Sequence, residues 1–62
     1  MRIPEDAQNV AYTEVNQASY VTYFSVGRWH LAPSLGNREI KSPIFSGSEE
    51  ELRQFVVQLS GG

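Results

Sequence analysis

The chain of 62 residues contains no cysteine and a single histidine, His30. Small domains usually compensate for a small core with disulfides, a bound metal or oligomerisation. The missing cysteines exclude disulfides, and one histidine alone cannot provide the set of Cys and His ligands that a structural zinc site needs. Only oligomerisation remains, and we therefore expect a homodimer that holds no metal.

Long apolar runs are also missing. Charged residues and Pro4 occur within the first six positions, and no stretch approaches the roughly 18 consecutive apolar residues that a membrane-spanning helix requires. The sequence therefore predicts a cytoplasmic protein that has no membrane as a partner.

Positive charge is sparse, with a formal net charge of −2 at pH 7. The acidic residues lie mainly towards the two ends of the chain, at Glu5, Asp6, Glu49, Glu50 and Glu51. Between residues 17 and 46 the charged side chains are Arg28, Arg38 and Lys41 against Glu39 alone. The net charge argues against general binding of polyanions, but the middle of the chain is weakly basic.

The sequence has little that catalysis requires. His30 could be combined with a serine and either Glu14 or Glu39, but such a triad must be held by a surrounding shell, for which so small a core leaves little room. The glycines before the C-terminal pair are isolated, so no phosphate-binding loop is present. We therefore expect no enzyme and no cofactor.

Strand-forming residues fill the first two thirds of the chain. Residues 9–17 alternate and are rich in β-branched and aromatic types, which predicts a strand, and residues 19–31 predict a second one in which Gly27 marks a bulge or bend. Pro33 should then end the ladder or lie at its edge, and Gly36-Asn37 supplies a tight reversal. A third strand over residues 38–45 completes an antiparallel meander.

Residues 48–59 predict a helix. Ser48 followed by Glu51 forms a capping-box pattern, and Arg53 is placed to pair with Glu49. Apolar side chains then recur on one helical face, at Leu52, Phe55, Val56 and Leu59. Glycines 61–62 are suited to end the helix. The stripe must lie across one face of the sheet, which should leave the opposite face bare in a monomer.

The predicted fold is an α+β domain with a three-stranded antiparallel meander sheet followed by one C-terminal packing helix. Residues 1–8 form an irregular arm, residues 9–60 the domain, and residues 61–62 a Gly-Gly tail. This architecture resembles the plant ethylene-response-factor DNA-binding domain and the arm-binding domains of phage integrases, which set their sheet into the major groove of DNA. The resemblance concerns architecture alone and implies no site residues.

The bare sheet face is the expected place of function, either as the dimer interface or as a surface for a protein partner. Tripeptide 28–30 combines a cation, a large aromatic ring and a titratable ring, and aromatic and arginine side chains carry much of the binding energy at interfaces. The candidate partner-binding residues are Trp29, Arg28, His30, Tyr20, Tyr23, Arg38 and Lys41.

Three functions follow from these residues. The first is a non-catalytic protein-interaction or regulatory module that is a homodimer. The second is a nucleic-acid-binding domain that uses the weakly basic sheet, because basic side chains can bind phosphates and aromatic side chains can stack on bases. The third is a carrier that uses the C-terminal Gly-Gly, by comparison with ubiquitin-like proteins, although their diglycine follows a β-strand and this one follows the predicted helix.

Overall fold

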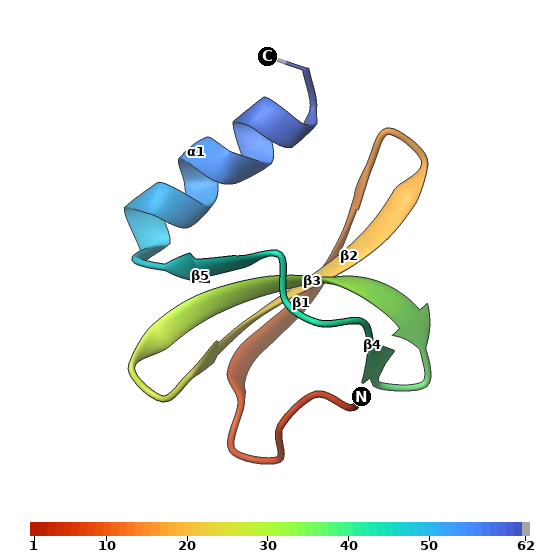
Figure 1. Ribbon diagram of the computed structural model, residues 1–62, viewed down its shortest axis with the longest axis vertical. Helices are drawn as coiled ribbons and strands as arrows, with labels where there is room; N and C mark the ends of the chain where they lie inside the picture. Colours follow the sequence, from red (N-terminus) through yellow and green to blue (C-terminus); the bar gives the residue numbers. More distant parts are fainter. Residues whose placement is uncertain (62) are drawn as a thin grey trace.

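The computed structural model describes residues 1–61 and consists of a twisted antiparallel sheet with one helix packed on it (Figure 1). The elements are, in chain order, β1 (Gln8–Val15), β2 (Ala18–Ser25), β3 (Arg28–Gly36), β4 (Glu39–Ile40), β5 (Phe45–Gly47) and α1 (Glu49–Leu59). Strands β1, β2 and β3 form a meander, and the short β4 and β5 both pair with β3 along its other edge. The α+β meander followed by one packing helix is confirmed.

The long strand expected over residues 19–31 is instead two strands. Ser25 pairs with Arg28 across a two-residue turn, and Val26 and Gly27 in that turn have φ values of 54° and 71°. Two consecutive positive φ angles characterise the type I′ turn that matches the twist of a hairpin. Gly27 therefore belongs to a chain reversal, and its assignment to a bulge or bend was wrong.

Valine is poorly suited to the first position of that turn. A β-branched residue in the left-handed region is strained by about 1–2 kcal/mol, whereas asparagine tolerates it. Because the Val26 side chain is 88% exposed, it gains almost nothing from packing. Val26→Asn should therefore raise the melting temperature by about 4–8 °C, the equivalent of roughly 1 kcal/mol in a domain of this size. Val26→Thr, which stays β-branched, should give no such gain in the same thermal melt.

Pro33 ends the ladder between β2 and β3, as expected, but β3 itself continues to Gly36 and pairs there with β4. It pairs with Tyr20 of β2, and its carbonyl accepts a hydrogen bond from the Lys41 backbone at 3.0 Å. The backbone N and O of a strand residue point to the same side of the strand. The N–H that Pro33 lacks would therefore have pointed, like its carbonyl, towards the segment between β4 and β5. That segment contains Pro43, and the edge strand is interrupted there.

One face of the sheet, here called the helix face, is covered by α1. Residues that face each other across antiparallel strands share a face, so Thr13, Thr22, Leu31 and Phe45 lie on this side. Leu31 and Leu52 are buried, and Phe45 stacks on Phe55 with ring centroids 5.1 Å apart. The predicted stripe of α1 therefore faces the sheet.

Local signals set both ends of α1. Ser48 and Glu51 form the predicted capping box, and Arg53 donates to Glu49 at 3.2 Å. Beyond Leu59, Gly61 adopts a φ of 83°, a left-handed conformation that is common just after a helix. The predicted start and end of the helix are confirmed over the described residues.

The opposite face, here called the arm face, is not bare. The segment before β1, residues 1–7, is an N-terminal arm that runs along β4, where Ile3 donates to the Arg38 carbonyl at 2.9 Å. The arm places Ile3 in a cluster of buried side chains with Val21, Tyr23, Ala32 and Ile40, flanked by Ala7 and Val10. The expectation of a bare second sheet face was therefore wrong, because Ile3 and Ala7 of the arm pack on it.

The described chain is as compact as a folded monomer of its mass. Its accessible surface of 4210 Å² compares with about 4,000 Å² for monomeric proteins of 7.0 kDa. Its radius of gyration of 10.8 Å matches the value of about 10.6 Å for a compact domain of this length.

Within residues 1–61, no helix has the length and apolar character that crossing a bilayer requires.

Candidate interaction surface

The tripeptide Arg28, Trp29 and His30 does not converge on one site. Alternation along β3 places Trp29 on the helix face, where it packs edge-on against Phe24 with ring centroids 5.5 Å apart. Arg28 and His30 lie on the arm face, and Arg28 is exposed. A cation, an indole and an imidazole adjacent in sequence are thus divided between two sides of the sheet.

His30 is fully engaged within the fold. Its Nε2 lies 3.0 Å from the Ser25 carbonyl oxygen and its Nδ1 lies 2.7 Å from the Ser46 hydroxyl, while the ring stacks on Tyr23. A carbonyl only accepts, so Nε2 donates and, in the neutral ring, Nδ1 accepts from Ser46. His30 ties β2, β3 and β5 together, and both of its ring nitrogens have partners.

Tyr20 and Tyr23 lie on opposite faces of β2. Tyr20 is half-buried on the helix face, whereas only 2% of Tyr23 is exposed in the arm-face core. Burial raises the pKa of the Tyr23 phenol above its ordinary value, because the charged form is poorly solvated there. Tyr23 is therefore a core residue that a partner does not reach while the chain is folded.

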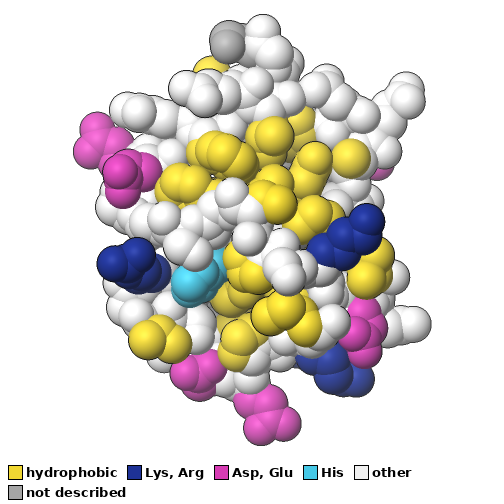
Figure 2. Space-filling model, viewed as in Figure 1, with side chains coloured by type: hydrophobic (Ala, Val, Ile, Leu, Met, Phe, Trp, Pro, Cys, Tyr) yellow, Lys and Arg dark blue, Asp and Glu magenta, His cyan; other side chains and the backbone are white. Residues whose placement is uncertain are grey.

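The basic side chains are also far apart. Arg28 begins β3, whereas Arg38 lies in the turn beyond its end and Lys41 follows β4. The eight residue steps of β3 span about 26 Å, at roughly 3.3 Å per residue. Figure 2 shows hydrophobic side chains over the middle of one face, with Lys and Arg side chains separated around its rim. The weakly basic middle of the sequence does not fold into one basic patch.

A polar depression of about 490 Å³ lies beside the start of α1. Its lining residues are Gly27, Arg28, Ser46, Gly47, Ser48 and Glu51. Backbone and hydroxyl hydrogen bonds from Ser48, and to a smaller extent the nearby Arg28 charge, lower the pKa of Glu51 below its ordinary value of 4.5. The carboxylate thus serves as the helix cap, and its negative charge lies in the same depression as Arg28. Among residues 1–61, no three His, Cys, Asp or Glu side chains are grouped to hold a metal.

The outer edge of β1, which pairs with β2 alone, is a further candidate surface that sequence reasoning did not single out. Val15 and Ala18 close the β1–β2 turn as a hydrogen-bonded pair, and bonded pairs recur at every second position along antiparallel strands. Tyr12 and Glu14 fall between those pairs, so their N–H and C=O groups point away from β2. The open edge of β1 could have been derived from the predicted strand order, because the first strand of a meander lies at an edge of the sheet.

The two edges of the sheet differ in how far other segments cover them. Arm residues 1–3 lie along β4, where Ile40 donates to the Met1 carbonyl at 2.7 Å, and Pro43 interrupts the same edge. By contrast, β1 is regular over residues 11–15, after a bulge near Asn9, and has neither the proline nor the lysine that commonly protect an edge strand. The edge of β1 is therefore open to pairing.

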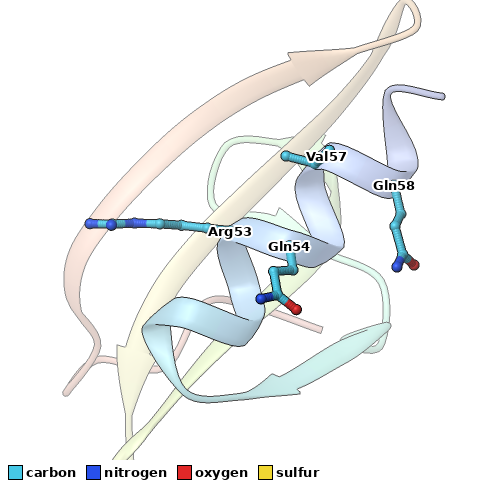
Figure 3. Close-up of a pocket in the computed structure, with 4 residues that line it drawn as sticks. All are labelled: Arg53, Gln54, Val57 and Gln58. Atoms are coloured by element: carbon cyan, nitrogen blue, oxygen red, sulfur yellow. The ribbon is translucent and has the colours of Figure 1, made fainter. Parts of the chain in front are cut away.

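An apolar groove of about 430 Å³ runs beside this edge on the helix face. Its lining residues are Thr13, Thr22, Leu52, Arg53, Val56 and Val57. Figure 3 shows Arg53 extending from α1 towards the β1–β2 hairpin, while Gln54 and Gln58 point away from it. At the hairpin tip, Asn16 Nδ2 donates to the Leu59 carbonyl at 2.7 Å and so fixes the hairpin to the end of α1. Strand edge and groove form one continuous surface.

Comparisons of the chain with models of known protein families, with curated proteins and with solved structures find no match. In the two DNA-binding architectures that the predicted fold resembles, the sheet is set into the major groove, and α1 leaves only the arm face of this sheet for such a contact. In this chain that face is occupied by Ile3, Ala7 and Val10. The carrier hypothesis depends on Gly62, which lies outside the described residues.

Proposed function

We propose that the chain is a non-catalytic interaction module that binds an extended protein segment along β1. The observation that carries this proposal is the asymmetry of the sheet, in which the β4 edge is covered by the arm while β1 is regular over residues 11–15 and pairs with β2 alone. A segment added to β1 gains backbone hydrogen bonds from Tyr12 and Glu14. Its alternate side chains lie next to the apolar groove, which gives selectivity.

A protein partner accounts for this surface better than a nucleic acid does. The groove contains one cation, Arg53, whose charge is already paired with Glu49 at 3.2 Å. Binding that depends on phosphate contacts needs several clustered Lys or Arg side chains, and the binding strength then falls steeply with salt. The cations on which the nucleic-acid alternative rested, Arg28, Arg38 and Lys41, are distributed over two ends of β3.

Selection from a random library of linear peptides tests the proposal. Binders should carry apolar residues at alternate positions and bind with a dissociation constant in the range of about 10–100 μM, with little dependence on salt. Glu14→Pro should abolish the binding, because it removes an outward N–H and leaves the bonds between β1 and β2 in place. Glu14→Gln, which keeps that N–H, should bind as the wild type does.

Binding that survives Glu14→Pro with unchanged affinity would place the contact elsewhere and overturn the proposal. The fold of each variant can be checked by the pattern of backbone amide signals in solution. Val26→Asp, a change at an exposed turn far from the groove, provides a second control that should leave binding unaltered.

A further inference from the structure

We infer that the strand bound along β1 is β1 of a second copy of the chain, paired antiparallel about a two-fold axis at Thr13. The inference rests on the proposed function, since it assigns the occupant of the same edge. A two-fold interface uses the same patch on both copies, so the patch must be complementary to itself. The edge of β1 meets this condition in one register.

Only two residues of the regular part of β1, Tyr12 and Glu14, offer outward backbone groups, and this limits the possible registers. A two-fold axis at Glu14 would set the two Glu14 carboxylates directly opposite each other, which is unfavourable. An axis at Tyr12 would set Glu14 opposite Val10, which lies at the irregular start of the strand. An axis at Thr13 pairs Tyr12 with Glu14 of the second copy, twice, and opposes no like charges.

The side chains agree with the register centred on Thr13. On the arm face, the exposed Tyr12 hydroxyl can donate to the Glu14 carboxylate of the second copy. On the helix face, Thr13 meets Thr13 and Ala11 meets Val15, and cross-strand pairs of these kinds are favourable. The side chains that meet on the helix face are themselves uncharged, and the Arg53 of each copy, which lines the groove beside Thr13, is already paired with Glu49.

A second copy is also the occupant that the small core favours. The described chain buries eight hydrophobic side chains, and domains of this size commonly gain stability by association. Five residues on each strand form less than a standard interface, which uses about 20–30 residues a side. The association should therefore be weak and dependent on concentration.

Sedimentation equilibrium on the full chain tests the inference. Wild type should be monomeric at about 1 μM and substantially dimeric at about 1 mM, as expected for a small interface. Glu14→Pro should remain monomeric throughout, while Glu14→Gln should still dimerise. A wild type that stays monomeric at about 1 mM, or a dimer unaffected by Glu14→Pro, would overturn the inference.

Charge substitutions at Tyr12 test the register, and the position is 58% exposed and so tolerates them. Tyr12→Lys places an ammonium opposite Glu14 of the second copy twice, which should strengthen the dimer by between about twofold and thirtyfold. Tyr12→Glu should weaken it by a comparable factor. Equal effects of the two substitutions, or the reverse order, would contradict the register.

The outcomes also separate this inference from the proposed function. If library peptides bind wild type and fail to bind Glu14→Pro, but the chain stays monomeric, then β1 is a binding edge whose occupant is another protein. If the chain dimerises through β1 and the peptides compete with the dimer, both proposals are supported. If neither peptides nor a second copy bind at β1, both are overturned.

Discussion

Ile3→Ala should lower the free energy of unfolding by about 2–4 kcal/mol, because the substitution leaves a cavity in the arm-face core. A domain of this length has a total stability of roughly 3–9 kcal/mol, so a large part of it would be lost. The residue is only 3% exposed although it belongs to an irregular segment. Urea unfolding followed by the fluorescence of Trp29 measures the change directly.

A second isoleucine provides the matched control. Ile44 is 47% exposed and lies in the segment between β4 and β5, so Ile44→Ala removes the same atoms from a more solvent-exposed position. Its cost should be about 1 kcal/mol or less. Equal losses for the two substitutions would show that the arm does not contribute a buried side chain to the core.

Phe55→Ala should have the next largest effect, a loss of about 2–3 kcal/mol of stability. Full removal of a core phenylalanine costs about 3–5 kcal/mol, but Phe55 is half-buried and its principal contact is the ring of Phe45. Loss of that contact should loosen α1 from β5 and widen the groove beside β1.

The control for the helix is Val57, which lies off the packing stripe and is 55% exposed. Val57→Ala should change the free energy of unfolding by no more than about 0.5 kcal/mol. A Phe55→Ala variant that melts within a degree or two of wild type would contradict the packing of α1 on β5.

The helix could be predicted from sequence because its signals are local. Ser48 and Glu51 are three residues apart, and the apolar stripe repeats within three turns, so the signals that set the start and the packing face of α1 lie within the segment itself. The pairing of β1 with the strand that follows it was equally accessible, since a short turn forces neighbouring strands to pair. The third strand expected over residues 38–45 was wrong, because that stretch holds only β4 and the start of β5.

The turn at residues 26–27 could not be predicted in the same way. Val26 is a strong strand former, and its left-handed conformation is set by the pairing of β2 with β3, which overrides the local preference. Similarly, Ile3 donates to the Arg38 carbonyl, a contact between segments far apart in the chain, so composition alone described the arm only as irregular.

The candidate partner-binding site also depends on how the strands pair and alternate. Residues 28–30 are adjacent in sequence, but strand alternation separates their side chains, just as it separates Tyr20 from Tyr23 along β2. The open edge of β1 was overlooked because backbone groups carry no signature in the residue types. It is defined by strand order, which identifies Tyr12 and Glu14 as the residues with outward amides.

Backbone hydrogen exchange at residues 12–14 tests the central claim most directly. In dilute solution the Thr13 amide, bonded within the sheet, should exchange slowly, while the amides of Tyr12 and Glu14 exchange quickly. Raising the protein concentration, or adding a selected peptide, should slow exchange at Tyr12 and Glu14 together and leave Thr13 nearly unchanged. If Tyr12 and Glu14 stay unprotected under both conditions, β1 is not the binding edge of this protein.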